Sequence, residues 1–469
     1  MKTGITSLNG DFSFPKNWCR AVGLLALAVF FNLGLNQRAG AQTFTLSNTW
    51  TVANGTAHIG NNSGLNRGVA YSSVSNQVFV ANRTTGTTGF IDVFDGATGA
   101  LLSGAGGIAG ANLGIDQVGV GDDGTLYGAP LQTSVSTTAG SLTVYSWTNW
   151  FNNSTPYPAY ASASGDPVVA NYTGKRIGDS MAVTGSGTNT LILMAVAGTG
   201  EGCTNFVLLH TADGTNFTPT AVFVPTGLPS IGGNILGICF YTNGTFLVFP
   251  GSGASSHNVF VVSYPANFAS QATVFGTVLG NAAPGTMAFN LTGAIDYSSQ
   301  GKMLAVAQTA SQSVNTNAIF SLTNFPTAAS QLTTATNPTP NANGNATGGA
   351  ALGGAGKTNF LYVLESNNGL RAYTINYTAA ATPPGISTAP VGAGGIYPAY
   401  TLTVAASGTG PFSYQWLASN SGTNTASTFT NIPAATNVVY AINAPSTNYY
   451  EVIITNSAGS VTSTPVRVA

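Results

Sequence analysis

The sequence predicts an all-β protein whose larger part is a six-bladed β-propeller closed by an N-terminal strand. Three observations favour this fold. A pattern of short strands recurs six times, a spare strand pattern precedes the first repeat, and the composition combines few charges with 59 glycines. A unit of four short strands that recurs every 50 to 63 residues is typical of one propeller blade.

Each repeat begins with two apolar strands joined by a tight turn, followed by a polar loop and a third strand that contains an aromatic residue. Turn signals such as Asp123-Gly124 and Asn243-Gly244 separate the first two strands, as two-residue hairpins require. The six strand pairs read GVAYSSVSNQVFVAN (from Gly68), VGVGDDGTLYGAP (Val118), MAVTGSGTNTLILMAVA (Met181), LGICFYTNGTFLVFP (Leu236), GAIDYSSQGKMLAVAQ (Gly293) and GAALGGAGKTNFLYVLE (Gly349).

The ring is expected to close by strand exchange. Fourth strands follow most repeats, but the sixth repeat has none, and FTLSNTWTVAN (residues 44–54) supplies a strand pattern before the first. Pairing of residues 44–54 with 369–377 would remove an exposed sheet edge. A right-handed β-helix is the alternative, although its rungs are usually shorter, roughly 20–30 residues. Small residues are expected where the first strands approach the axis: Gly68, Gly119, Ala182, Gly237, Gly293 and Ala350.

The scarcity of charge excludes several classes of protein. Lys and Arg number 12 and Asp and Glu 13 in 469 residues, which is 5% charged. Coiled coils need charged solvated faces, and charge-driven disorder needs more charge and fewer Val, Ile, Phe and Tyr residues. No basic surface for nucleic acid can be assembled.

The N-terminus has the features of an export signal. Lys2, Lys16 and Arg20 precede an apolar segment at residues 21–35, and Ala39-Gly40-Ala41 follows as a small-residue cleavage site. This order is typical of a secretory signal peptide. A membrane anchor is the alternative, but the apolar segment is shorter than the roughly 20 residues that span a bilayer. We therefore expect a signal peptide over residues 1–41, a secreted or cell-surface protein, and no membrane span after cleavage.

The C-terminal segment resembles the immunoglobulin-like domains of bacterial secreted proteins. Trp416 in Tyr-Gln-Trp matches the core tryptophan of that family's third strand, and Tyr450 matches its tyrosine-corner position. Val404 and Val452 stand where the family has its two cysteines, so the disulfide is not expected. The resemblance implies a β-sandwich over residues 387–469 that serves as a spacer or a second binding surface.

Residues 42–378 also resemble an uncharacterised family of secreted bacterial propellers. That resemblance implies a fold and no activity. Pro383-Pro384-Gly385 marks the expected linker over residues 379–386. Two cysteines follow the signal peptide, Cys203 and Cys239, and both a disulfide and two free thiols are compatible with the repeat alignment.

Eight of the 20 charged residues that follow the expected signal peptide are predicted to collect on one face of the ring. In a propeller, the loops that lead into first strands and those that join second to third strands share a face. A polar funnel there would hold a ligand, whereas the alternative is a set of ion pairs that satisfies the loops. Asp296, on a first strand, is the most notable because a carboxylate near the axis is costly unless paired. The candidate ligand-binding residues are Arg67, Arg83, Asp116, Arg176, Asp179, Glu201, His257, Asp296 and Glu365.

No motif predicts a cofactor, a metal or a catalytic residue. His58, His210 and His257 lie in separate repeats, so a transition-metal site is not expected. Asp92-x-x-Asp95-Gly96 and Asp122-Asp123-Gly124 fit turns better than a calcium loop. The aromatic residues Trp147, Trp150, Tyr157 and Tyr160 are compatible with either a sugar-stacking platform or core packing.

These observations favour a secreted, non-catalytic binding or adhesion protein whose partner is an extracellular glycan or protein. The first alternative is an extracellular carbohydrate-active lyase or hydrolase. Its paired carboxylates would come from Asp116, Asp179, Glu201, Asp296 or Glu365. The second alternative is a structural component of the cell surface or matrix.

Overall fold

The chain forms two compact units, one spanning Phe44–Tyr377 and one containing Thr378–Ala469. We call them the larger and the smaller unit. The predicted signal peptide lies outside the described residues. The computed structural model describes residues 43–469 except 57, 61–63, 84–88, 109–112, 149–154, 199–201, 224, 226–227, 229–236, 243, 250–258, 265–277, 282–292, 310–313, 324–329, 340, 344–346, 379–380, 393–398, 420–428 and 444–446.

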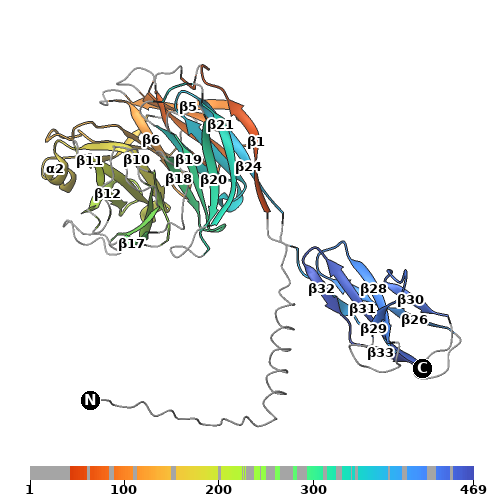
Figure 1. Ribbon diagram of the computed structural model, residues 1–469. Coiled ribbons are helices and arrows are strands. Elements are labelled where there is room, and N and C mark those ends of the chain that lie inside the picture. The colour runs from red at the N-terminus through yellow and green to blue at the C-terminus, as the bar shows by residue number, and fades with distance from the viewer. Residues whose placement is uncertain are drawn as a thin grey trace, which may run out of the picture. The chain divides into compact units, whose positions relative to one another are not determined.

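The described strands of the larger unit form six four-stranded antiparallel sheets (Figure 1). The first three sheets consist of β2 (Asn66–Ser72), β3 (Gln77–Asn82), β4 (Gly89–Asp95) and β5 (Leu101–Ile108); β6 (Ile115–Val120), β7 (Leu126–Pro130), β8 (Thr143–Trp147) and β9 (Tyr157–Ala161); and β10 (Arg176–Thr184), β11 (Leu191–Gly198), β12 (Gly202–Thr211) and β13 (Phe217–Phe223). The others consist of β14 (Gly237–Phe240), β15 (Thr245–Phe249), β16 (Phe260–Ser263) and β17 (Val278–Asn281); β18 (Gly293–Ser298), β19 (Met303–Gln308), β20 (Val314–Ser321) and β21 (Ser330–Pro338); and β22 (Gly348–Gly353), β23 (Phe360–Glu365), β24 (Gly369–Thr378) and β1 (Thr43–Val52).

The last of these sheets combines the two ends of the larger unit. β1, drawn in red in Figure 1, pairs with β24, as the sequence predicts for residues 44–54 and 369–377. Side-chain hydrogen bonds also connect the two strands. Thr49 Oγ1 lies 2.7 Å from Thr374 Oγ1, and Asn376 Nδ2 donates to Ser47 Oγ. The first strands contact one another in the cycle β2–β6–β10–β14–β18–β22–β2. The fold is therefore β-propeller-like, and these antiparallel sheets differ from the β-helix that was the alternative.

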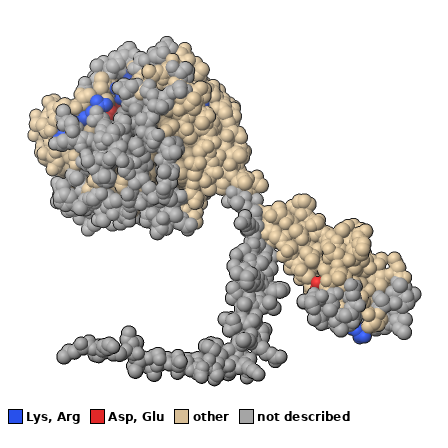
Figure 2. Space-filling view, viewed as in Figure 1, with Lys and Arg blue, Asp and Glu red and all other residues tan. Residues whose placement is uncertain are grey.

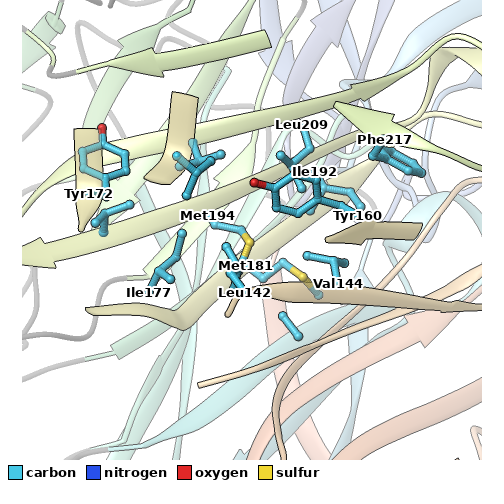
Figure 3. Close-up of a cluster of buried hydrophobic side chains, with 14 of the residues drawn as sticks. Leu142, Val144, Tyr160, Tyr172, Ile177, Met181, Ile192, Met194, Leu209 and Phe217 are labelled. Carbon is cyan, nitrogen blue, oxygen red and sulfur yellow. The ribbon is translucent and has the colours of Figure 1, made fainter. Parts of the chain in front are cut away.

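Burial explains why the inner strands are mostly apolar. All six residues of β3 and β19 are buried, as are the last five of β23, because neighbouring sheets cover both faces of each strand. Figure 3 shows one of these interfaces, between the second and third sheets. Met181 and Met194 from the third sheet meet Leu142 and Val144 at the start of β8. Unbranched methionine side chains fill irregular gaps of this kind.

Small residues allow the first strands to approach closely, as expected. A Cβ atom on Gly68 of β2 would lie 2.9 Å from Gln117 Cα and Val118 N of β6, and one on Gly349 would lie 2.9 Å from Val69 N. Real Cβ atoms do not approach backbone so closely, so any side chain here would push two sheets apart.

We expect the Gly68→Ala variant to lose about 1–3 kcal/mol of unfolding free energy, because its methyl group overpacks the contact between two backbones. Urea denaturation measures this loss. Gly104→Ala is the matched control, since its Cβ would meet only Ile91 O, at 3.5 Å, on the outer strand β5. This control should be as stable as the wild type, and equal stability of both variants would contradict a tight contact at Gly68.

The smaller unit is a separate β structure with its own core. Its strands are β25 (Gly385–Thr388), β26 (Tyr400–Thr403), β27 (Ala405–Ser407), β28 (Ser413–Ser419), β29 (Phe429–Asn431), β30 (Val439–Ile442), β31 (Asn448–Asn456), β32 (Gly459–Thr462) and β33 (Val466–Val468). β25 pairs with β27 and begins inside the range expected to be a linker, so the structured part starts earlier than residue 387. Trp416 is fully buried, and its indole donates to Asn437 O (2.9 Å). Val404, Tyr450 and Val452 pack in the same core.

Helices are few and short in the described chain. They are α2 (Pro167–Tyr172), η2 (Gly187–Asn189) and η3 (Ala355–Lys357). The carboxylate of Asp166 caps α2 by accepting from Val168 N (2.7 Å). Among the described residues, no helix has the length and apolarity that crossing a membrane would need.

Candidate functional site

Five of the predicted site residues come together where the first three sheets meet. Arg67 and Asp116 lie near the starts of β2 and β6, Arg83 directly follows β3, and Arg176 and Asp179 belong to β10. We call these five residues the arginine–aspartate cluster. Asp116 Oδ1 lies 3.5 Å from Arg67 Nε and 3.2 Å from Arg83 Nη1. Arg176 holds Asp179 with two hydrogen bonds of 2.5 and 2.6 Å, the geometry of a strong bidentate pair.

The cluster is deeply buried, which controls its electrostatics. Asp116 has no exposed surface, and Arg67 and Arg83 are each 6% exposed. Burial raises the pKa of Asp116 to about 6, although Arg67 and Arg83 oppose this shift. Burial also lowers the pKa of Arg83. Because its charges face one another and join three sheets, the cluster fits the ion-pair interpretation better than an open polar funnel.

Glu365 lies apart from this cluster, in the sixth sheet. It ends β23 and is 1% exposed. Asn337 Nδ2 donates to its Oε1 (3.0 Å), and Arg371 Nη1 donates to its Oε2 (3.4 Å). Burial raises the pKa of Glu365 to about 7 despite both partners. This carboxyl therefore joins the fifth sheet, through Asn337, to the sixth sheet, through Arg371.

The first strands enclose a cavity of about 470 Å³ on the axis of the ring. Exposed turn residues between first and second strands, including Ser73, Asp122 and Gln300, form its rim. We call it the hairpin-end cavity, because these hairpin turns surround its mouth. A second cavity of about 60 Å³ lies toward the starts of the first strands, beside Asp179 and Gln117. Every first strand contributes more than one residue to the lining of the hairpin-end cavity, among them Val69, Val118, Met181, Ile238, Ile295 and Ala350.

Asp296 belongs to the hairpin-end cavity and not to the arginine–aspartate cluster. Its Oδ1 accepts from Tyr297 N and its Oδ2 accepts from Leu352 N, both at 2.8 Å. Lys357 Nζ lies 3.8 Å from Oδ2. Lys357 lies in the turn between β22 and β23, so this carboxylate faces the end of the ring opposite to the predicted polar face. A carboxylate on a first strand was expected to need a partner. Two backbone amides and Lys357 provide the partners of Asp296.

The structure adds residues that were not among the candidate ligand-binding residues. Lys357, Gln300, Tyr241 and Tyr297 all line the hairpin-end cavity. Tyr241 and Tyr297 pack edge to face, with ring centroids 4.7 Å apart. A sequence signal exists for Lys357 alone, because the glycines at 353, 354 and 356 mark an unusual turn just before it.

A histidine–aspartate pair is a further contact that the sequence did not reveal. His58 Nδ1 lies 2.8 Å from Asp92 Oδ1, and Asn82 Nδ2 donates to Asp92 Oδ2 (2.7 Å). Asp92 is 1% exposed, and burial raises its pKa. Asp92 therefore does not belong to a solvent-exposed turn or calcium loop; it anchors the loop that carries His58.

The structure also places several other residues that the sequence analysis named. Trp147 and Tyr160 are buried core residues, whereas Tyr157 is exposed and donates to Asn216 Oδ1 (2.5 Å), so these three do not form one platform. Cys239 is a free, buried thiol. Glu201, His257 and Trp150 lie outside the described residues. Within the part of the chain that is described, no three His, Cys, Asp or Glu residues are grouped to hold a metal ion.

Charged side chains are sparse on the described surface. In Figure 2, the visible Lys, Arg, Asp and Glu atoms of the larger unit are few and most of them gather in one area, while the rest of the described surface is tan. This agrees with the 5% of charged residues in the sequence.

No protein-family model and no curated protein matches the chain. Many solved structures are similar to it, including the following two. One is an α-L-arabinanase from Penicillium chrysogenum in complex with arabinobiose, with 14% identity over 71% of this chain and 98% of that chain and a TM-score of 0.43. The other is a putative 6-phosphogluconolactonase from Bacteroides uniformis, with 13% identity over 67% of this chain and 84% of that chain and a TM-score of 0.40. Likeness at this level carries no argument about activity.

Proposed function

We propose that this chain is a secreted or cell-surface protein that binds an extracellular glycan or protein without catalysing a reaction. In this proposal, a signal peptide (residues 1–41) precedes a six-bladed β-propeller (42–378) closed by its N-terminal strand. An immunoglobulin-like domain (387–469) follows as a spacer or second binding surface. The nearly uncharged composition and the secretory N-terminus support the location, and the strand pairing supports the architecture.

The observation that carries this proposal is the hairpin-end cavity itself. Six first strands enclose about 470 Å³, a size within the range of small-molecule sites. Its lining combines apolar side chains of the first strands with polar groups such as Asp296 and Lys357. Preformed cavities with this mixture of surfaces are the usual places for ligands.

A catalytic role has less support from the candidate carboxylates. General acid–base catalysis needs a carboxyl group that can reach the substrate. Asp116 and Glu365, whose pKa values of about 6 and 7 would suit a general acid, are buried and paired with arginines. Asp179 is held by Arg176. Asp296 lines a cavity, but both of its oxygens accept backbone hydrogen bonds.

A combined binding and activity screen tests this proposal. The chain from Gln42 onward is immobilised and exposed to a glycan array and to extracellular proteins, and is also incubated with a panel of polysaccharides. We expect at least one ligand to be retained and recovered chemically unchanged. Release of cleaved product that Asp296→Asn or Asp116→Asn abolishes would replace this proposal with the carbohydrate-active alternative, and a screen without any ligand would contradict it.

A further inference from the structure

We propose that the hairpin-end cavity binds an uncharged saccharide, whose hydroxyl groups bridge Lys357 Nζ and the carboxylate of Asp296. This inference rests on the proposed binding function and names the ligand class and the contacting residues. It places the ligand at one end of the ring. The sequence predicted the site at the other end, which carries the arginine–aspartate cluster.

The distance between the two charged groups is the first step of the argument. Lys357 Nζ and Asp296 Oδ2 are 3.8 Å apart, which exceeds a normal hydrogen bond. Among the described residues, the ammonium group of Lys357 makes no hydrogen bond, and its side chain is 42% exposed. A hydroxyl group can accept from this ammonium and donate to the adjacent carboxylate, so a polyol satisfies both groups at once.

The carboxylate is held in place for this contact. Tyr297 N and Leu352 N each donate to one of its oxygens at 2.8 Å, so the Asp296 side chain cannot rotate toward Lys357 without losing a hydrogen bond. Each oxygen can still accept a further hydrogen bond. A fixed acceptor beside a partly exposed donor is a preorganised pair for a ligand.

The turn that carries Lys357 has an unfavourable backbone. Lys357 has φ +56°, a left-handed conformation that residues other than glycine rarely adopt, and Gly354 and Gly356 on its N-terminal side have φ +80° and +60°. The neighbouring sheet fixes this turn, because Ser298 Oγ donates to Gly356 O (2.6 Å). Such a conformation persists only where the surrounding structure maintains it, so the position of Lys357 beside the cavity is fixed.

The charge and the walls of the cavity select an uncharged ligand. Besides Lys357, the charged residues that line it are Asp296 and Asp122, so the cavity has no excess of positive charge for an anion. Asp122 is already engaged, since its Oδ2 accepts from Gly185 N (3.0 Å). Tyr241 and Tyr297 add aromatic surface, and the apolar C–H faces of sugar rings pack on such surface.

Calorimetric titration tests the inference on the chain from Gln42 onward. The probes are D-glucose, D-galactose, D-mannose, D-xylose and L-arabinose with their disaccharides, and D-glucuronate is the charged comparison. Lys357→Asn removes the ammonium group while asparagine tolerates the left-handed backbone. Lys302→Asn is the matched control, because Lys302 has φ +46° in the equivalent turn of the preceding sheet and does not line the cavity.

We expect at least one uncharged probe to bind at or below about 10 mM and to lose about tenfold or more in affinity in Lys357→Asn, the loss expected for one charged hydrogen bond. Lys302→Asn should bind like the wild type, and both variants should keep the wild-type unfolding temperature. Absence of binding by every uncharged probe, equal weakening in both lysine variants, or tighter binding of glucuronate would each overturn the inference.

The outcomes separate this inference from the proposed function. If every saccharide fails but the array captures a different ligand, the binding function stands and the cavity assignment is wrong. If a saccharide binds through Lys357 and is then cleaved, the cavity assignment stands and the non-catalytic function is wrong.

Discussion

Replacing Trp416 with alanine is expected to unfold the smaller unit at a much lower temperature while the larger unit keeps its own transition. The Trp416 side chain is fully buried, stacks on Tyr440 with ring centroids 6.0 Å apart, and donates to Asn437 O. Truncating a buried tryptophan costs about 3–5 kcal/mol, because a large cavity remains. Asn437 O would also lose its donor. Differential scanning calorimetry measures both transitions.

Val438→Ala is the control for this experiment. Val438 is exposed in the same unit, so its truncation should change the unfolding free energy by no more than about 0.5 kcal/mol. Two separate transitions, of which only one moves in Trp416→Ala, are the expected result for two compact units. A single transition that shifts as a whole would show that the units unfold together.

The second large effect concerns the pH dependence that Glu365 imposes on stability. Its pKa rises from 4.5 to about 7 on folding, chiefly because burial disfavours the charged form. The folded state therefore binds the proton more tightly than the unfolded state. The resulting stabilisation is complete below the unfolded pKa and is lost as the pH rises through 7. A shift of this size corresponds to about 3 kcal/mol.

We expect the wild type to lose up to about 3 kcal/mol relative to Glu365→Gln between pH 5 and pH 9. Chemical denaturation at several pH values measures the difference. Glutamine mimics the protonated acid imperfectly beside Arg371, which adds a constant to the difference in unfolding free energy between the two proteins. Because this constant does not vary with pH, the test is how the difference changes with pH.

Asp213→Asn serves as the comparison, because folding lowers the pKa of Asp213 and raises that of Glu365. Hydrogen bonds from Asn216 and Thr215 hold the pKa of the exposed Asp213 carboxylate below its usual range. Its contribution is present above the unfolded pKa and is lost only in acid. The difference between this variant and the wild type should therefore be flat over the same pH range. A flat Glu365→Gln difference would show that Glu365 stays ionised in the folded protein.

The binding proposal and the pH-dependence prediction concern different parts of the larger unit. The arginine–aspartate cluster and Glu365 lie where charge is buried and paired, and their expected effects are on folding. Lys357 and Asp296 line a cavity, and each can still form a further hydrogen bond there. Their expected effect is therefore on ligand affinity. Charged residues in a protein with so few charges therefore fall into two groups, which burial and pairing distinguish.

The repeated strands and the exchanged strand were predictable from the sequence alone. Apolar runs such as those around Phe79 and Leu361, turn residues such as Gly124, and the strand pattern at residues 44–54 are local signals, because strand periodicity and hairpin chemistry depend on neighbouring residues. The resemblance to immunoglobulin-like domains implied core positions for Trp416 and Val452, and both side chains are buried. The expected linker at residues 379–386 overlaps the start of β25 at Gly385, because strand ends are only weakly encoded by local patterns.

Only the tertiary structure decided which charged residues meet. The sequence placed Asp116 and Asp296 in one group, yet the first contacts Arg67 and Arg83 and the second faces Lys357 at the other end of the axis. His58 and Asp92 were assigned to unrelated features and form a pair. Contacts of this kind depend on the stagger and twist between neighbouring sheets and on the depth of burial, which arise from packing over the whole ring and not from any segment of the chain.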